Sequence, residues 1–339
     1  MIKDILLKQD NRQLYLATAE DPQYSYTTNR LNIYKFSENG FGDRITDPTT
    51  FGGTTNLYSV TFTSSGNGLL IGEDSPNLRL YQWSDTTGVG SLIDSVAPAS
   101  SINGCTFSPN FAMTVANTSS PYLFGYQLSG SGFGTALTGA DGSSSSSSVA
   151  INTAENAVAI AHNWVSFYVY TFSSSAFGTK FTSPSETNQA INKVKFSKSG
   201  DYIFTTYGAY LHAYPFNYST GIGTKYATTY ISWQTHKDIA VSPDGNFVAA
   251  ALSNSPYIRV YHWDDSTHWG SAVSDPATLP TSAGKCIGFS KDGKYLAMGL
   301  TNSPYIIVYE WSASGFGAKF DNPATLPSTA ISSLDWSYI

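Results

Sequence analysis

One tyrosine position recurs through the whole chain at a nearly constant interval. The steps between successive copies are 47, 45, 44, 44, 47 and 48 residues, which makes seven copies of one unit. The copies are Tyr34, Tyr81, Tyr126, Tyr170, Tyr214, Tyr261 and Tyr309. A period of this length, built from short alternating segments, is typical of a β-propeller with one four-stranded blade per repeat.

Two further markers share this period. An apolar residue ends the innermost strand of each copy, at Leu7, Phe62, Phe107, Ile151, Phe196, Val241 and Phe289. A bulky apolar residue followed by glycine marks the turn before each outer strand, at Phe41-Gly42, Val89-Gly90, Phe133-Gly134, Phe177-Gly178, Ile222-Gly223, Trp269-Gly270 and Phe316-Gly317. The sequence therefore predicts an all-β fold, a seven-bladed propeller of four-stranded antiparallel blades.

We predict a single propeller domain over residues 1–339, because each blade buries its faces against its neighbours and the core grows with every copy. The repeats run roughly over 1–56, 57–102, 103–147, 148–191, 192–236, 237–284 and 285–330, with a closing strand at 331–339. Residues 334–337 repeat the inner-strand pattern, and residues 4–8 resemble the same strand of the first copy. We expect N- and C-terminal strands to close the ring in one blade, with the order of the two left open.

Composition narrows the range of partners. The net charge is −6, which argues against nucleic acid, since that partner requires a basic face. No apolar run reaches the roughly 20 residues of a membrane span, so we expect no membrane insertion. The start of the chain lacks the pattern of an export signal. Cys105 and Cys286 lie in separate copies, so we expect two free, buried thiols rather than a disulfide.

The amino-acid sequence of the last two copies resembles a known kind of repeat. Residues 255–263 and 303–311 both read Ser-Pro-Tyr followed by a strand that ends in Tyr-X-Trp. Residues 275–280 and 322–327 share Pro-Ala-Thr-Leu-Pro. These segments resemble WD-repeat-like propellers and, more narrowly, repeat proteins of tailed bacteriophages, marine ones included. The resemblance implies a virion component that is made in the host cytoplasm; a cytoplasmic protein is the alternative.

Departures from the repeat mark candidate binding residues. Loops between second and third strands should share one face of the ring with the crossings between blades, and three departures fall there. Copy one has an insertion, copy four replaces Ser-Pro-Tyr, and copy five carries tyrosines followed by an aromatic crossing. The candidates are Tyr24, Tyr26, His162, Asn163, Trp164, Tyr207, Tyr210, Trp233, Gln234 and His236. Aromatic rings beside amides suit a glycan site, but also a protein contact or an ordinary surface.

Other patterns favour structure over chemistry. The repeated Ser-Pro-Tyr is expected to stiffen a loop, since proline fixes φ. A ring of stacking residues is the alternative. The run Ser143 to Ser148 is expected to be a loop between blades three and four, because it has nothing to bury. The five histidines show no metal-ligand spacing, and no nucleophile elbow or phosphate-binding loop is present. We therefore expect no metal, no cofactor and no catalytic residue.

The sequence thus predicts a non-enzymatic structural or adhesion component of a phage particle, acting as a rigid platform for protein contacts. Its expected partners are other virion proteins, of the capsid or the tail, and a glycan of the host cell surface. A glycan-binding adhesin, a cytosolic interaction scaffold and a lactonase-like hydrolase are the alternatives. The motif specifies a blade rather than a reaction, so these functions rest on analogy.

Overall fold

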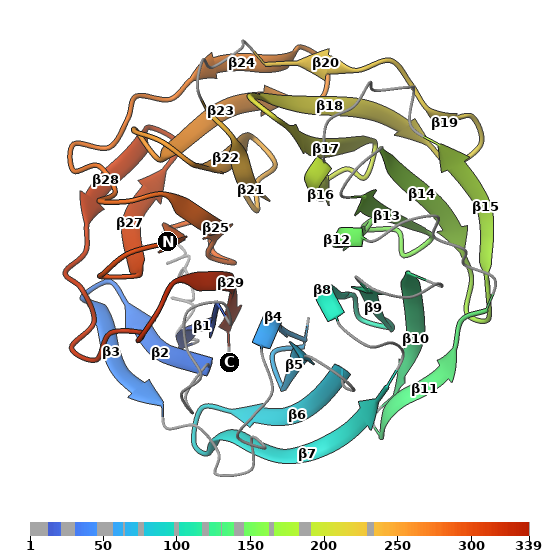
Figure 1. Cartoon of the computed structure of the whole chain (residues 1–339), viewed down its shortest axis with the longest axis horizontal. Coiled ribbons are helices and arrows are strands. Elements are labelled where there is room, and N and C mark those ends of the chain that lie inside the picture. Colours follow the sequence, from blue (N-terminus) through green and yellow to red (C-terminus); the bar gives the residue numbers. More distant parts are fainter. Residues whose placement is uncertain are drawn as a thin grey trace, which may run out of the picture.

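The computed structural model of the chain is a ring of β-sheets around a central opening (Figure 1). The structure describes residues 13–21, 31–45, 57–63, 65–73, 78–97, 102–116, 122–129, 131–138, 146–162, 166–182, 191–228 and 234–338. Within these ranges the chain forms strands, turns and loops, and no helix that could cross a membrane occurs among them. Seven blades of four antiparallel strands make up the ring, which confirms the predicted fold.

The innermost strands line the central opening, and the second strands pack behind them. In blades 1 to 7 the innermost strands are β29 (Ile331–Tyr338), β4 (Leu57–Phe62), β8 (Ile102–Phe107), β12 (Ser146–Ile151), β16 (Ile191–Phe196), β21 (His236–Val241) and β25 (Gly284–Phe289). The second strands are β1 (Leu14–Glu20), β5 (Gly68–Glu73), β9 (Phe111–Ala116), β13 (Ala157–His162), β17 (Tyr202–Tyr207), β22 (Phe247–Leu252) and β26 (Tyr295–Leu300). The second strands consist mainly of small and apolar residues, which are buried on both faces of the strand because another blade packs on either side.

The third strands carry the repeated tyrosine, and the outer strands form the rim of the ring. The third strands are β2 (Leu31–Ser37), β6 (Leu78–Ser84), β10 (Leu123–Ser129), β14 (Phe167–Phe172), β18 (Tyr210–Asn217), β23 (Ile258–Asp264) and β27 (Ile306–Ser312). The outer strands are β3 (Gly40–Ile45), β7 (Gly88–Val96), β11 (Gly132–Ala136), β15 (Phe177–Thr182), β24 (His268–Ala272) and β28 (Gly315–Lys319). In blade 5 the outer strand is split into β19 (Gly221–Ile222) and β20 (Tyr226–Ala227), which both pair with β18.

The ring closes in blade 1, as predicted, with strands from both ends of the described chain. The order β29-β1-β2-β3 places the C-terminal strand innermost, which the sequence had left open. Trp336 of β29 is 1% exposed and packs edge-to-face on Phe36 of β2. Residues 4–8, with the pattern of an inner strand, lie outside the described residues.

The repeated tyrosine is buried in every blade, with at most 9% of its surface exposed. In two blades its hydroxyl donates to a backbone carbonyl of the crossing that enters the blade. Tyr34 donates to the Thr325 carbonyl at 2.9 Å, and Tyr309 donates to the Thr278 carbonyl at 2.8 Å. The tyrosine therefore stabilises both the sheet, through its ring, and the connection to the preceding blade, through its hydroxyl.

The glycines of the outer turn have two separate roles. The glycine after the bulky residue lies against the third strand: a Cβ at Gly42 would be 3.3 Å from Cβ of Lys35, and one at Gly270 only 2.9 Å from Cβ of His262. The positive φ that the turn requires falls on the residue before the bulky apolar one. Gly315, before Phe316, has a φ of +103°, which favours glycine. The repeated glycine thus marks a close approach of two strands rather than the turn.

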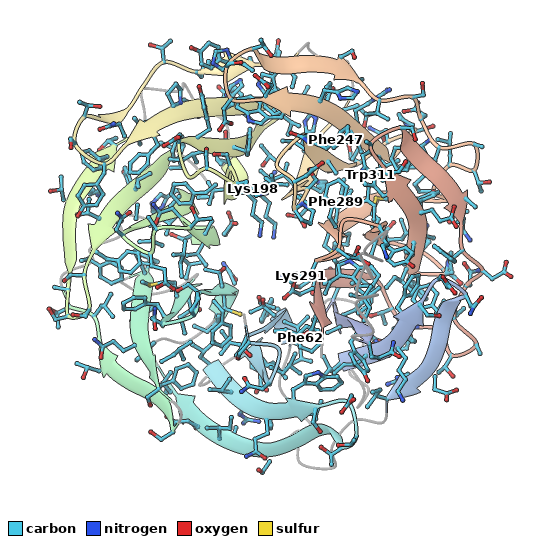
Figure 2. All side chains as sticks on the ribbon, turned by 180° about the vertical axis from the view of Figure 1, so that it is seen from behind. Phe62, Lys198, Phe247, Phe289, Lys291 and Trp311 are labelled. Atoms are coloured by element: carbon cyan, nitrogen blue, oxygen red, sulfur yellow. The ribbon has the colours of Figure 1, made fainter. Side chains whose placement is uncertain are left out.

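Aromatic pairs join five of the seven pairs of neighbouring blades. In each pair, a ring at the start of a second strand meets the side chain two residues after the repeated tyrosine of the next blade. The ring centroids are 4.9 to 5.1 Å apart and edge-to-face in Tyr15–Trp83, Phe111–Phe172, Tyr202–Trp263, Phe247–Trp311 and Tyr295–Phe36. Figure 2 shows Phe247 and Trp311 side by side between blades 6 and 7. Such pairs contribute about 0.5–1.5 kcal/mol each beyond their burial.

The prediction for the serine run was wrong in its second half. Ser146 to Ser148 belong to the inner strand β12, and Ser146 and Ser148 are buried. At the contact with blade 5, Ser148 Oγ accepts from the Val194 amide at 3.4 Å and Ser147 donates to the Asn192 carbonyl at 2.9 Å, while Ser146 Oγ lies 3.4 Å from Nδ1 of His162 in its own blade. Small hydroxyl side chains fit where two inner strands approach closely, so a polar run that looks like a loop can form a strand here.

The Ser-Pro-Tyr segments form tight loops, as expected of a stiffened connection. The Ser255–Pro256 and Ser303–Pro304 peptide bonds are cis, and the following Tyr257 and Tyr305 have φ of 67° and 66°. Tyr305 is half-buried, and its carbonyl accepts a hydrogen bond from the Leu300 amide at 2.7 Å. The segment therefore closes the end of the hairpin between the second and third strands.

Replacement of Tyr309 by Phe should lower the free energy of unfolding by about 1 kcal/mol, since the ring stays buried while the hydroxyl bond to the Thr278 carbonyl is lost. Urea unfolding followed by fluorescence measures the change. Tyr218→Phe is the matched control, because Tyr218 is 50% exposed. Equal effects of the two substitutions would contradict the role given to the repeated hydroxyl.

Candidate functional site

The sequence-predicted binding residues divide into a buried group and an exposed group. His162, Gln234 and His236 are 1%, 9% and 0% exposed. Gln234 donates to the Ser255 carbonyl at 2.8 Å and accepts from the Asn254 amide at 3.1 Å, so it ties the crossing into blade 6 to a loop of that blade. These three residues support the face where the crossings lie rather than forming its surface.

Tyr207 and Tyr210 are the half-buried members of the predicted set. They pair with each other across the tight turn between β17 and β18, and the Tyr207 ring stacks on His212 at 5.0 Å. His236 lies beneath this turn, with Nδ1 3.1 Å from the Gly208 carbonyl. Burial lowers the pKa of His236, opposed by that contact. The structure thus brings Tyr207, Tyr210 and His236 together at one edge of blades 5 and 6.

Tyr24, Tyr26, Asn163, Trp164 and Trp233 lie outside the described residues. The insertion of copy one and the replaced motif of copy four therefore stay predictions.

A second site, which the sequence analysis missed, lies at the central channel. Among the described strands, each inner strand has one edge that pairs with no other strand, so its backbone groups need partners from elsewhere. Polar side chains of the preceding blade supply them. The side chain of the third residue of an inner strand accepts a hydrogen bond from the backbone amide of the fourth residue of the inner strand in the next blade. The acceptor and donor pairs, at 3.0 to 3.4 Å, are Ser333 and Val60, Ser59 and Cys105, Ser148 and Val194, and Asp238 and Ile287.

The second residues of these strands complete the pattern. Asn103 donates to the Ser146 carbonyl at 2.9 Å, and Asn192 donates to the His236 carbonyl at 3.3 Å. A polar side chain at the same place in successive inner strands was the signal that could have revealed these bonds. It was hidden because the residue type changes from blade to blade.

Lysines gather in one sector of the channel, on blades 5, 6 and 7. Lys193, Lys237 and Lys285 line a cavity of about 440 Å³ at the channel mouth. Lys193 lies 4.0 Å from Asp238, and Lys285 forms an ion pair with Asp21. Lys198 and Lys291 lie at the edge of the central opening in the view from behind (Figure 2). This sector thus holds a cluster of lysines, in a chain whose net charge is −6.

The carboxylates of the channel are occupied by structural bonds. Asp238 Oδ2 accepts from the Ile287 amide at 3.0 Å. Asp335 Oδ2 accepts from the Phe62 amide at 2.9 Å and from the Thr61 hydroxyl at 2.8 Å, while its Oδ1 lies 3.6 Å from Lys291 Nζ. Each carboxylate therefore holds two blades together.

The remaining reactive groups of the channel are two thiols and an amine, all at least partly buried. Cys105 and Cys286 are both free thiols, as predicted; Cys286 is buried and Cys105 is partly buried. Desolvation raises the pKa of the Cys105 thiol to about 12 and raises the pKa of Cys286 still further, so both stay protonated and unreactive. Burial also lowers the pKa of the Lys195 ammonium, against the opposing effect of Asp238. Within the described ranges, no three His, Cys, Asp or Glu side chains gather as a metal site.

Comparison with known proteins shows the fold alone. No family model and no curated protein matches the chain. Among solved structures it is similar to a candidate 6-phosphogluconolactonase of Bacteroides fragilis, with a TM-score of 0.76, 12% identity and 97% and 99% of the two chains covered. It is similar to the periplasmic gluconolactonase PpgL of Pseudomonas aeruginosa, with a TM-score of 0.72, 13% identity and coverage of 96% and 99%. It is also similar to the β-propeller domain of Cps50 (Swd1) from Myceliophteria thermophila, with a TM-score of 0.61, 10% identity and coverage of 83% and 90% of the two chains.

Replacement of Asp238 by Ala should destabilise the ring by about 1–3 kcal/mol, since it leaves the buried Ile287 amide without an acceptor. Asp238→Asn keeps an oxygen at that place and should lose clearly less stability. Urea unfolding of the two variants beside the wild type measures the difference. If both variants lost the same free energy, charge rather than the amide bond would be the source of the effect.

Proposed function

We propose that this chain is a non-catalytic propeller that acts as a rigid platform for binding. The observation that carries the proposal is the state of the channel carboxylates. Asp238 and Asp335 both accept backbone amides of the next blade, so these two carboxylates serve the contact between blades. Unreactive thiols at Cys105 and Cys286 leave no activated nucleophile of that type.

The surface of the chain supports a role in binding. Only 12% of the residues are charged, a composition that suits close contact better than long-range attraction. Tyr207 and Tyr210 present half-buried rings at the edge of blade 5. They also suit a glycan-binding adhesin, the first alternative, in which rings stack on sugar C–H groups.

The proposed place of action is a phage particle, where the chain would serve as a capsid decoration or a tail-associated protein. The support for this part is the resemblance of residues 255–263 and 303–311 to phage repeat proteins. A rigid disc with binding loops suits attachment to other virion proteins or to a host glycan. A cytosolic interaction scaffold is the alternative location for the same architecture.

The chain should remain with phage particles through density-gradient purification, at a fixed number of copies per particle. Quantitative mass spectrometry of the gradient fractions measures this number against the major capsid protein. A host cytosolic protein of similar abundance serves as the control for carry-over. Recovery of the chain only in the particle-free fraction would exclude the virion role and favour the scaffold.

Lactone hydrolysis is a second candidate, and two observations favour it. Two structures of similar fold carry the names of lactonases, and Lys195 in the channel has a lowered pKa. A lysine amine that is easily deprotonated can act as a base or a nucleophile. The low identity to those proteins gives no further support for this activity.

We expect no hydrolysis of 6-phosphogluconolactone or gluconolactone above the spontaneous rate. A pH-stat assay with purified protein measures acid release directly. Lys195→Met is the matched variant, since it keeps the length of the side chain and removes the amine. Hydrolysis by the wild type that this variant loses would overturn the non-catalytic proposal.

A further inference from the structure

Blades 2 and 3 form the one neighbouring pair, within the described residues, that lacks both members of the aromatic pair. The second strand of blade 2 begins with Gly68 where five other blades have a ring. The residue two after the repeated Tyr126 is Leu128, whereas its equivalents in the other blades are Phe or Trp. Blades 4 and 5 lack one ring, at Ala157, but there Phe216 packs on Phe181 and Phe196.

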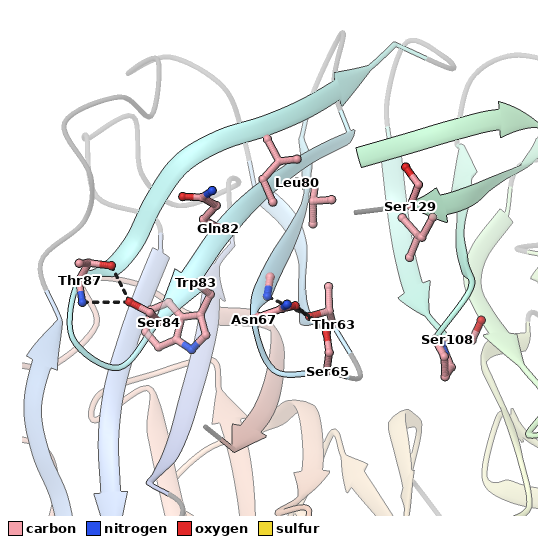
Figure 3. A pocket seen from close by; sticks show the side chains of 14 residues that line it. Thr63, Ser65, Asn67, Leu80, Gln82, Trp83, Ser84, Thr87, Ser108 and Ser129 are labelled. Atoms are coloured by element: carbon pink, nitrogen blue, oxygen red, sulfur yellow. Dashed lines mark hydrogen bonds between the residues drawn. The ribbon is translucent and has the colours of Figure 1, made fainter. Parts of the chain in front are cut away.

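The missing rings leave a groove of about 580 Å³ between the two blades. Figure 3 shows its walls: Thr63, Ser65 and Asn67 lie across from Ser108 and Ser129. Gly68 and Leu128, which replace the ring pair, both line this groove. A volume of this size lies within the usual range of ligand sites in proteins.

The groove is a local gap between blades that are otherwise held firmly together. Nearer the crossings, the two blades touch so closely that a Cβ at Gly72 would lie 2.8 Å from Ile102 Cγ2. At the rim, Asp94 Oδ2 accepts the Phe133 amide at 2.9 Å. Contacts on both sides of the groove therefore fix the distance between the two blades, so that they do not move together to fill the space that the aromatic pair would occupy.

The lining combines apolar walls with a neutral polar margin. Leu80 is 5% exposed, and Ile93 and Leu128 are half-buried. Ser65, Asn67, Gln82, Thr87 and Ser129 are exposed around them, and none of the lining residues carries a charge. Apolar centres with polar margins are typical of protein interfaces, where one buried aromatic side chain supplies much of the affinity.

We propose that this groove is a docking site for one aromatic side chain, carried by an uncharged segment of a partner protein. The incoming ring takes the place of the pair that the blade contact lacks. The inference rests on the proposed role as a binding platform and names the partner's chemistry at one site. A sugar is less suited, because the one aromatic residue of the lining, Trp83, is buried and packs on Tyr15 of blade 1.

Methyl NMR of the full chain tests the proposal with blocked, uncharged amino acids. N-acetylphenylalaninamide, N-acetyltyrosinamide and N-acetyltryptophanamide should shift the methyl signals of Leu80, Ile93 and Leu128, with dissociation constants on the order of millimolar. N-acetylalaninamide and methyl glucoside are the comparison probes and should leave these signals unchanged. Shifts by the glucoside alone would overturn the proposal in favour of a sugar site. The absence of shifts with every probe would also overturn it.

Variants that fill the groove separate docking from non-specific contact. Leu128→Phe restores the ring found in the equivalent position of other blades and should abolish the shifts at Leu80 and Ile93. Ile93→Phe fills the groove from the opposite wall and serves if Leu128→Phe fails to fold. Leu279→Phe, at a 39% exposed position in a crossing, is the control and should bind like the wild type. Unchanged shifts in a folded filled variant would overturn the assignment.

These outcomes are distinct from those of the proposed function. The chain can remain with phage particles while the groove stays empty, in which case only the docking site is wrong. Conversely, aromatic probes can bind in the groove of a chain that is absent from particles.

Discussion

The contact between the inner strands of neighbouring blades is the constraint on which the ring depends. Each inner strand has a free edge at the channel, and its backbone groups would be costly to leave unpaired. Side chains such as Ser333, Ser59 and Asp238 satisfy the edge of the next blade. Every blade therefore completes its neighbour, so the blades are stable as a closed ring rather than singly.

This constraint also explains what the channel carboxylates do in the structure. A carboxylate that accepts two bonds at a blade contact, as Asp335 does, serves the fold and is held in one orientation. Carboxylates, which a hydrolase would need for its reaction, thus serve here to strengthen the contacts between blades. The binding surfaces that we propose lie elsewhere, on the loops near Tyr207 and in the groove where the aromatic pair between blades is absent.

The aromatic pairs show how a repeat leaves a groove where one pair is absent. Where Phe247 meets Trp311, the space between two blades is filled and the surface is closed. Where Gly68 faces Leu128, the same backbone leaves a groove. The groove needs no loop insertion and no unusual backbone, so a search for inserted or aromatic-rich segments, like the one that led to Tyr207, does not detect it.

The period of the repeated tyrosine was sufficient to predict the number and type of blades, because one blade needs a constant length of chain and each needs the same buried anchor. The sequence alone also predicted that strands from both ends share a blade. Tertiary structure decided that β29 is innermost, that Ser146 to Ser148 form a strand, and that His162, Gln234 and His236 are buried. These features depend on which side chains meet across blades, and residues about 45 positions apart carry no local signal of that contact.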